Sequence, residues 1–285
     1  MVIETLHFIY DVARLDERLL IREFEAAGAP FKLVNAEQLI FRFPGNDLRG
    51  TAFIRTISQV RTQLIAQLYE SLGGSSINPA RSIINGNNKA VTLALLSRFN
   101  VPTPNTLVAF SGELAVKSLD QVGRPTIVKP IHGSWGRLVS LVHGPEDLEL
   151  LTRHRESMEN PQYSVYLLQE FIRKPGRDIR VTVVGDRAVA AIYRYAVTDD
   201  WRTNTARGGK AEPVKIDPEL EDISVRATKA VGAYYAGVDV VESDGGYKVL
   251  EVNTVPEFKN VQRVTGVNVA RAIVELTIDL IKRGF

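Results

Sequence analysis

Residues 237–259, GVDVVESDGGYKVLEVNTVPEFK, decide the fold of the C-terminal part of this chain. Two apolar runs, 238–241 and 247–252, flank SDGG at 243–246, a segment of turn-forming residues. Apolar runs joined by such a segment predict a β-hairpin. We expect its loop to contain three residues, 244–246.

That loop would set the strand register and the position of three oxygen-bearing side chains. It would place Asp239 directly opposite Glu251, and Asn253 would share a face with Glu251 because residues two apart on a strand point the same way. Opposed carboxylates repel, so the pair requires compensation. A hard cation would provide it, and so few protein ligands leave room for water and phosphate oxygens, as Mg²⁺ prefers. The alternative is an ordinary hairpin with solvated acids.

Length and composition bound the class of protein. A chain of 285 residues suits two or three subdomains. With 45% hydrophobic and 24% charged residues it is typical of a soluble globular protein. A net charge of +2 is too small to indicate nucleic-acid binding. The absence of cysteine excludes disulfides, a thiol nucleophile and a cysteine-based zinc site.

Positive charge is concentrated in one part of the sequence. Residues 173–210 contain nine Lys or Arg residues against four acids, which favours an anionic ligand such as a phosphate, a carboxylate or an acidic protein. The start, MVIETLHFIYD, lacks a basic segment followed by an apolar one, and no apolar run is long enough to span a membrane. We therefore expect a cytoplasmic protein.

Residues 1–88 alternate between strand and helix patterns, which predicts a small parallel sheet. The expected strands are 6–10, 31–34 and 52–54, and the expected helices begin at Leu15 and span 59–72. No G-x-G-x-x-G follows the first strand, so the dinucleotide fingerprint is absent. Arg14, Arg55 and Arg61 follow strands, where such sheets bind ligands. We interpret them as solvated surface side chains.

The middle of the chain contains a glycine-bearing loop beside a lysine. We expect a short apolar turn after Pro79, helices 90–99 and 112–119, and strands 106–109, 125–129 and 138–142. Lys129 ends a strand just before HGSWGR, 132–137, whose backbone N–H groups could cradle phosphate. The loop is not a P-loop, since no Gly-Lys-Ser/Thr occurs and a strand follows it. The alternative is a plain hairpin tip.

The last third is predicted to contain most of the sheet. We expect strands 163–169, 178–184 and 187–195, a helix over 218–231, a short connection over 261–266 and a closing helix over 269–281. Residues 197–213 show little periodicity and two glycines, which is typical of a loop over a site.

These features occur in the same order in the ATP-grasp carboxylate–amine ligases, which the chain resembles over its whole length. KPIHGSWGRLVS, QEFIRKPGRDIRV, NTARGG and EVNTVPEFKN are most similar to the enzymes that load amino acids onto the amino-group carrier protein LysW. The resemblance implies an α/β (α+β) ATP-grasp fold, with the nucleotide held between two α+β subdomains. It implies a Rossmann-like pre-ATP-grasp domain at 1–87, a central subdomain at 88–165 and a C-terminal subdomain at 166–285.

The resemblance also implies roles for individual residues toward ATP and Mg²⁺. Lys89 and Lys129 would hold the phosphates, and Asp239, Glu251 and Asn253 would bind Mg²⁺. The loop over the phosphates would comprise Gly133, Ser134, Trp135, Gly136, Arg137, Leu138 and Val139. Adenine would contact Gln169, Glu170, Phe171 and Ile172, and the ribose would contact Asp178. Catalytic contacts to phosphate would come from Arg180 and Arg202.

The amino-acid substrate would lie against a further set of residues. These are Arg194, Thr203, Asn204, Thr254, Val255, Pro256, Glu257, Phe258 and Asn260. The chain departs from the family pattern at Asn88, because many relatives have an acid immediately before the first lysine. That departure removes a local salt bridge, although Lys89 itself is present.

The implied reaction joins α-aminoadipate to LysW. ATP phosphorylates the γ-carboxylate of the carrier's C-terminal glutamate, and the α-amino group of α-aminoadipate attacks the acyl phosphate. Such steps need charge neutralisation and alignment more than a protein nucleophile. The basic stretch 173–210 would dock the acidic carrier, and the resemblance implies a homodimer or homotetramer.

Other readings remain open at this point. Glutamate-loading relatives resemble EFKGF where this chain has EFKNV at 257–261, which favours α-aminoadipate. One methylene separates the two substrates, a difference of about 1–3 kcal/mol at most, so dual specificity stays open. A protein glutamate ligase of the same fold, a nucleotide-binding regulatory module and a structural α/β protein are the further alternatives.

Overall fold

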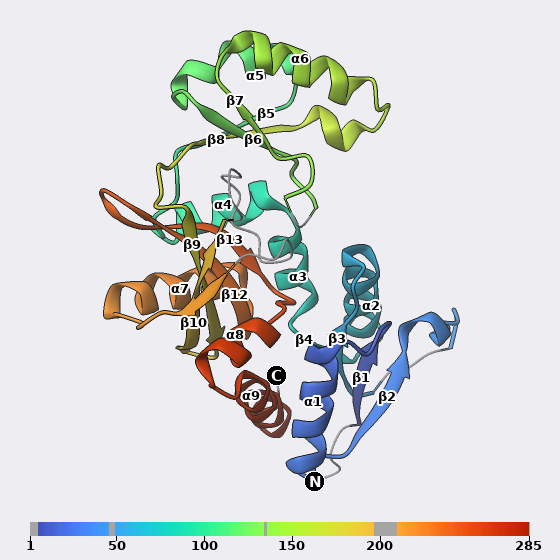
Figure 1. Cartoon of the computed structure of the whole chain (residues 1–285). Coiled ribbons are helices and arrows are strands. Elements are labelled where there is room, and N and C mark those ends of the chain that lie inside the picture. The colour runs from blue at the N-terminus through green and yellow to red at the C-terminus, as the bar shows by residue number, and fades with distance from the viewer. Residues whose placement is uncertain (1–4, 46–48, 134–135, 197–209, 285) are drawn as a thin grey trace.

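The computed structural model describes residues 5–45, 49–133, 136–196 and 210–284. Three sheets organise these residues, with strand orders β2-β1-β3-β4, β5-β8-β6-β7 and β11-β10-β9-β12-β13. Figure 1 shows the sheet of β5–β8 standing apart from the other two. None of the described helices is long and apolar enough to cross a membrane.

The first sheet, with its helices, forms what we call the N-terminal unit. Its strands are β1 (Leu6–Tyr10), β2 (Phe31–Asn35), β3 (Thr51–Arg55) and β4 (Ser75–Ile77). Its helices are α1 (Leu15–Ala26), α2 (Gln59–Ser71), α3 (Ala80–Asn87) and the 3-10 turn η1 (Ala36–Gln38). All three strand pairs are parallel, which confirms the predicted small parallel sheet.

The short turn expected after Pro79 is wrong, because α3 occupies that stretch. The Glu70 carboxylate accepts a hydrogen bond from Ala80 N at 2.7 Å at the start of this helix. A carboxylate satisfies one of the unpaired N–H groups there and favours the positive end of the helix dipole. The cap comes from α2 and not from the residues next to Pro79, so the local pattern did not reveal it.

The second sheet forms a lobe with a hydrophobic core of its own. Its strands are β5 (Thr106–Ala109), β6 (Thr126–Lys129), β7 (Ser140–Val142) and β8 (Tyr166–Glu170). Its helical segments are α5 (Gly112–Lys117), η2 (Leu119–Gln121), α6 (Pro145–Glu156) and η3 (Pro161–Ser164). The core contains Val128, Leu148, Tyr166 and Leu168. The predicted domain bound at 165 lies just before β8, a strand that pairs with β5 and β6.

The third sheet carries helices on both faces. Its strands are β9 (Arg177–Val184), β10 (Arg187–Tyr195), β11 (Ala211–Pro213), β12 (Tyr235–Ser243) and β13 (Gly246–Asn253). The helices around it are α4 (Lys89–Arg98), α7 (Pro218–Val231), α8 (Lys259–Thr265) and α9 (Val269–Arg283). One core joins the sheet to α4 and α7, and another joins it to α8 and α9. The connection predicted over 261–266 is therefore wrong, since most of it lies in α8.

The N-terminal unit and the third sheet share the second of these cores. Phe53 of β3 stacks on Tyr235 of β12, with ring centroids 6.0 Å apart and an interplanar angle of 9°. Helices α1 and α9 lie side by side in Figure 1. Leu20 and Ile273, one from each helix, are both fully buried in this core. The shared core fixes the N-terminal unit against the third sheet, whereas the lobe packs around its own core.

The loop of the β12–β13 hairpin is shorter than expected, but Asp239 and Glu251 are paired as predicted. Ser243 pairs with Gly246, so the loop contains two residues and not three. A β-bulge then inserts one extra residue, Leu250, and Asp239 still pairs with Glu251. The bulge restores the register that the shorter loop would have shifted by one residue.

Candidate active site

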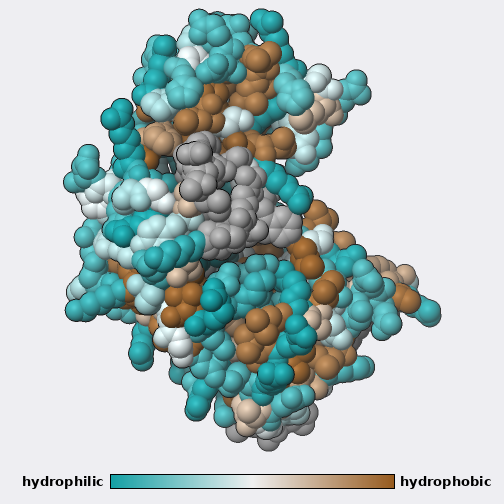
Figure 2. Space-filling view, in the orientation of Figure 1, coloured by the Kyte–Doolittle hydropathy of each residue, from teal (hydrophilic) through white to brown (hydrophobic). Residues whose placement is uncertain are grey.

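A cavity of about 690 Å³ lies where the lobe, the third sheet and the N-terminal unit meet. Figure 2 shows the surface hollowed where the lobe joins the rest of the molecule. The predicted site residues that line this cavity are Lys89, Lys129, Gly133, Gly136, Arg137, Val139, Gln169, Glu170, Phe171, Ile172, Asp178, Arg180, Arg194, Asp239, Glu251, Asn253, Thr254, Val255, Pro256, Glu257 and Asn260. The cavity has the size expected of a ligand pocket.

Two of the predicted site residues do not line the cavity. Leu138 adopts a positive φ of 57° beside it, and Phe258 is fully buried in the core shared by the N-terminal unit and the third sheet. Ser134, Trp135, Arg202, Thr203 and Asn204 lie outside the described residues.

Two lysines reach the cavity from different parts of the chain. Lys129, the last residue of β6, donates to Gln169 Oε1 at 2.6 Å. Lys89, the first residue of α4, donates to Gly133 O at 2.6 Å and lies 3.3 Å from Glu251. Burial lowers the pKa of Lys129 to about 8, and neighbouring cations act in the same direction. Ammonium groups gathered in this way favour an anion such as phosphate.

The start of α4 explains the departure at Asn88. The Asn88 side chain accepts hydrogen bonds from Ala90 N at 3.1 Å and Val91 N at 3.2 Å, so it caps the helix. Asparagine is among the preferred N-cap residues. Asn88 therefore has a local structural function, and Lys89 is the first residue of the capped helix.

Four charged side chains from neighbouring strands, three of them buried and Arg180 partly exposed, form a chain of ion pairs. Arg194 binds both oxygens of Asp178, at 2.7 and 2.9 Å, and its Nη2 lies 3.1 Å from Asp239 Oδ1. Arg180 binds both oxygens of Asp239, at 2.5 and 2.9 Å. Strand pairing brings them together, since Asp178 is opposite Arg194 and Arg180 is opposite Asp239. A ribose hydroxyl that contacts Asp178 would share this carboxylate with Arg194.

The arginines also determine the charge state of the central acid. Burial by itself raises the pKa of Asp239, but Arg180 and Arg194 outweigh burial and hold this pKa below its usual range. Asp239 is therefore an anion at neutral pH. An anion bound in the cavity could attract the same two arginines, so Asp239 and the ligand compete for them.

The predicted metal set supplies only oxygen donors. Asp239 and Glu251 face each other across the strands, and Leu250 and Glu251 both line the cavity because of the bulge. Asn253 donates to Gly237 O at 3.3 Å through its amide nitrogen, which does not use its amide oxygen. Two carboxylates and an amide fit the preference of Mg²⁺ for oxygen ligands. Within the described ranges, no three His, Asp or Glu side chains gather as a metal cluster.

The end of β8 connects the lobe to the third sheet. Gln169 donates to Thr106 Oγ1 at 3.0 Å while accepting from Lys129, which fixes the orientation of its amide. Glu170 accepts from Asn105 N at 3.1 Å and from Lys248 Nζ on β13 at 3.1 Å. These contacts place residues 169–172 at the junction, along one side of the cavity.

The N-terminal unit contributes cavity residues that the sequence interpretation missed. Beside Gly86 and Asn87 at the end of α3, five of them lie near the first sheet: Arg14, Thr56, Ile57, Gln59 and Thr62. These five follow β1 or β3, the two strands between which the sheet order reverses, and open α/β sheets bind ligands at such a point. The sequence feature that could have identified this part of the site was the position of Arg14 after a strand.

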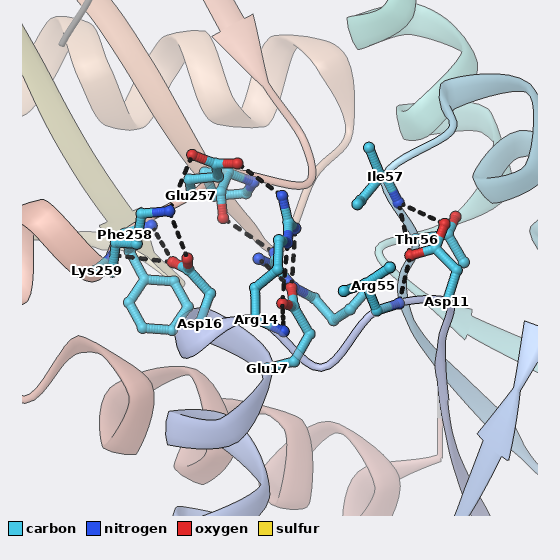
Figure 3. A network of polar contacts seen from close by, with 12 residues as sticks. Asp11, Arg14, Asp16, Glu17, Arg55, Thr56, Ile57, Glu257, Phe258 and Lys259 are labelled. Atoms are coloured by element: carbon cyan, nitrogen blue, oxygen red, sulfur yellow. Dashed lines mark hydrogen bonds and ion pairs between the residues drawn. The ribbon is translucent and has the colours of Figure 1, made fainter. Parts of the chain in front are cut away.

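The interpretation of Arg55 as a solvated surface residue is wrong. Its side chain is fully buried, lies 3.3 Å from Glu17 and donates to Pro256 O at 2.9 Å. Figure 3 shows Arg55 beside Glu17 and Arg14, within a polar network that reaches Glu257. An arginine at the end of an apolar strand gives no sign of which distant carboxylate will neutralise it.

The chain matches two protein-family models. Residues 6–85 match the LysX preATP-grasp domain, and residues 86–277 match the RimK-like ATP-grasp domain. The second match covers more than half of the chain.

Similar proteins agree with these matches. An α-aminoadipate–LysW ligase, LysX, of Sulfurisphaera tokodaii is 36% identical, with 96% of this chain and 98% of that protein covered. A glutamate–LysW ligase, ArgX, of the same organism is 34% identical, with 94% and 95% covered. The solved structure of the ATP-grasp ligase PsnB, complexed with a precursor variant, Mg and ADP, is 20% identical with a TM-score of 0.73, covering 97% of this chain and 98% of that one. This chain belongs to the RimK-like ATP-grasp family of ligases, with an N-terminal LysX-type preATP-grasp domain.

Proposed function

We propose that this chain is an ATP-dependent carboxylate–amine ligase that joins the α-amino group of α-aminoadipate to the γ-carboxylate of the C-terminal glutamate of LysW. One observation carries the proposal. A single cavity gathers lysines and arginines around opposed carboxylates, in a chain similar over almost its whole length to an α-aminoadipate–LysW ligase.

The side chains of the cavity suit transfer of a phosphoryl group to a carboxylate. ATP, the carrier carboxylate and the amino acid are all anionic, and the described cavity contains Lys89, Lys129, Arg180 and Arg194. Preorganised cations stabilise the charge that develops during phosphoryl transfer. The γ-phosphate leaves ATP for the carboxylate, the amine then displaces phosphate from the acyl phosphate, and an amide forms.

Magnesium is proposed as the metal, held by Asp239, Glu251 and Asn253. When bound, it would neutralise and align the phosphates. Asp239 becomes available once Arg180 transfers its two hydrogen bonds from that carboxylate to phosphate. The Mg in the complex of PsnB supports this assignment by analogy of fold.

The carrier is proposed as an acidic protein partner. Residues 173–210 contain nine basic residues against four acids. Arg180 and Arg194 are held in the cavity by ion pairs, so the proposed attraction to an acidic surface relies on the other basic residues of this stretch. The bounds 1–87, 88–165 and 166–285, a homodimer or homotetramer, and a cytoplasmic location are proposed on the family resemblance.

Glutamate is the second candidate for the amino acid. The glutamate–LysW ligase is 34% identical to this chain, against 36% for the α-aminoadipate enzyme, so overall similarity separates the two substrates weakly. Asn260, which lines the cavity, stands where glutamate-loading relatives resemble EFKGF, and this position favours α-aminoadipate.

A coupled assay of ADP release tests the proposal. The purified chain is mixed with ATP, Mg²⁺ and LysW, and either α-aminoadipate or glutamate is added. We expect ADP release to require both the carrier and an amino acid, with α-aminoadipate giving the higher kcat/KM. Release that continues without the carrier, or without any amino acid, would contradict the proposal.

A further inference from the structure

The N-terminal unit holds the main chain of one wall of the cavity, residues 254–260. Four hydrogen bonds join side chains of the unit to backbone groups of that segment. Thr254 O accepts from Asn78 Nδ2 at 2.6 Å, Pro256 O accepts from Arg55 Nη1 at 2.9 Å, and Phe258 N and Lys259 N donate to Asp16 Oδ1 at 2.6 and 2.8 Å. Figure 3 shows the Asp16 carboxylate turned toward Phe258 and Lys259.

The charged groups behind these bonds are fully buried. Asp16, Glu17 and Arg55 each have 0% exposure. Removing charges from water carries a large desolvation penalty, and apolar side chains of similar volume often give equal or greater stability. Stability alone therefore does not account for these three residues. What they supply, and apolar residues cannot, is directional bonding to particular N–H and carbonyl groups.

The network extends to the rim of the cavity. Arg14 donates to Glu257 Oε1 at 2.7 Å and lies 3.0 Å from Glu17, and both Arg14 and Glu257 line the cavity. Asp16 Oδ2 has no hydrogen-bond partner, and the ammonium group of Lys259 lies 4.0 Å from it. The three acids Asp16, Glu17 and Glu257 balance the three bases Arg14, Arg55 and Lys259.

The position of this wall indicates what it contacts. Lys129 and residues 169–172 line the cavity from the lobe, whereas residues 254–260 line it beside the N-terminal unit. Lys89 and Lys129 attract phosphate toward the lobe. The part of the cavity beside Arg14 is therefore left for the acidic amino acid.

We propose that Asp16 and Arg55 are positioning residues for the amino-acid substrate. They act by fixing the backbone of residues 254–260 and contact neither Lys89 and Lys129 nor the proposed metal ligands. This inference rests on the proposed function, because it assigns that wall to a dicarboxylic amino acid.

Steady-state kinetics of Asp16→Ala and Arg55→Met test this assignment. We expect the KM for the amino acid to rise about tenfold or more in each variant, because small misplacements of a binding wall are costly. The KM for ATP should stay within about twofold of wild type. Asp16→Asn, which retains an acceptor oxygen for the two N–H groups, should recover part of the loss.

Asp217→Ala is the matched control. Asp217 accepts from Leu220 N at 2.8 Å at the start of α7 and does not line the cavity. This variant should lose stability while keeping both KM values. Thermal unfolding with and without ATP checks that each variant folds. If Asp16→Ala does not fold, Asp16→Asn takes its place in the kinetic comparison.

Equal rises in both KM values, or a loss of stability with unchanged KM values, would overturn the inference. The wild-type requirement for carrier and amino acid tests the proposed function separately. The ratio of variant to wild-type KM tests the positioning role, so the two failures are distinguishable.

Discussion

Nucleotide affinity should fall at alkaline pH because Lys129 loses its proton there. The pKa of Lys129 is lowered from an ordinary value of 10.5 to about 8: burial is the largest cause, Lys89 and Lys174 act in the same direction, and Glu251 and Asp239 act against them. A bound triphosphate adds negative charge beside the amine and so favours its protonated form. The free enzyme therefore takes up a proton when it binds ATP above about pH 8.

The linkage between proton binding to Lys129 and ATP binding sets the size of the change in affinity. If ATP restores the pKa of Lys129 to its ordinary value, affinity is constant below about pH 8 and falls about tenfold for each pH unit above it. Raising the pH from about 7 to about 9 should therefore weaken binding about tenfold, or about 1.4 kcal/mol.

Titration calorimetry with a non-hydrolysable ATP analogue at constant free Mg²⁺ measures this change. Lys129→Arg is the matched control, because its guanidinium keeps its charge over the whole range. The ratio of wild-type to Lys129→Arg dissociation constants cancels the titration of the nucleotide itself. A ratio that stays constant from about pH 7 to about pH 9 would refute the reasoning, because it would show that Lys129 does not titrate in this window.

Three further predictions concern the metal set, the loop beside the cavity and acid stability. Glu251→Ala should keep its melting temperature, since Glu251 is partly exposed, but lose Mg²⁺-dependent ADP release by about 100-fold or more; an unchanged rate would contradict the metal role. Arg155 is buried, donates to Leu138 O at 2.7 Å and leaves Nε and Nη1 without partners. Arg155→Met should therefore raise the KM for ATP by up to about tenfold with little change for the amino acid, and equal effects on both would count against a role in holding the loop. Burial raises the pKa of Glu17, but Arg55 and Arg14 outweigh burial and hold it below the usual 4.5. The stability that Glu17 contributes is therefore present above about pH 4.5 and is lost as the pH falls through the lower pKa that Glu17 has in the folded state. The free energy of unfolding, measured with denaturant, should therefore decrease less steeply toward acid pH in Glu17→Gln than in the wild type. Parallel pH profiles of the two proteins would exclude this origin.

The sequence by itself determined the fold family and most of the residues that line the cavity. Local patterns suffice for most of the strands, since period-two alternation and turn residues act over a few positions. They did not predict β4, and β11 lies within the stretch 197–213 that was expected to be a loop. The opposition of Asp239 and Glu251 was also predictable, although the predicted loop was one residue too long and the bulge at Leu250 compensated for it.

Only the tertiary structure decided how distant charges meet. Two of the helices that the sequence interpretation missed, α3 and α8, begin where a carboxylate from another element accepts their first N–H groups, Glu70 for α3 and Asp16 for α8. The burial of Arg55 against Glu17 and Pro256 has the same origin. A cap or ion pair depends on distance in space, and residues 16 and 258 become neighbours only after the sheets have packed on their shared core.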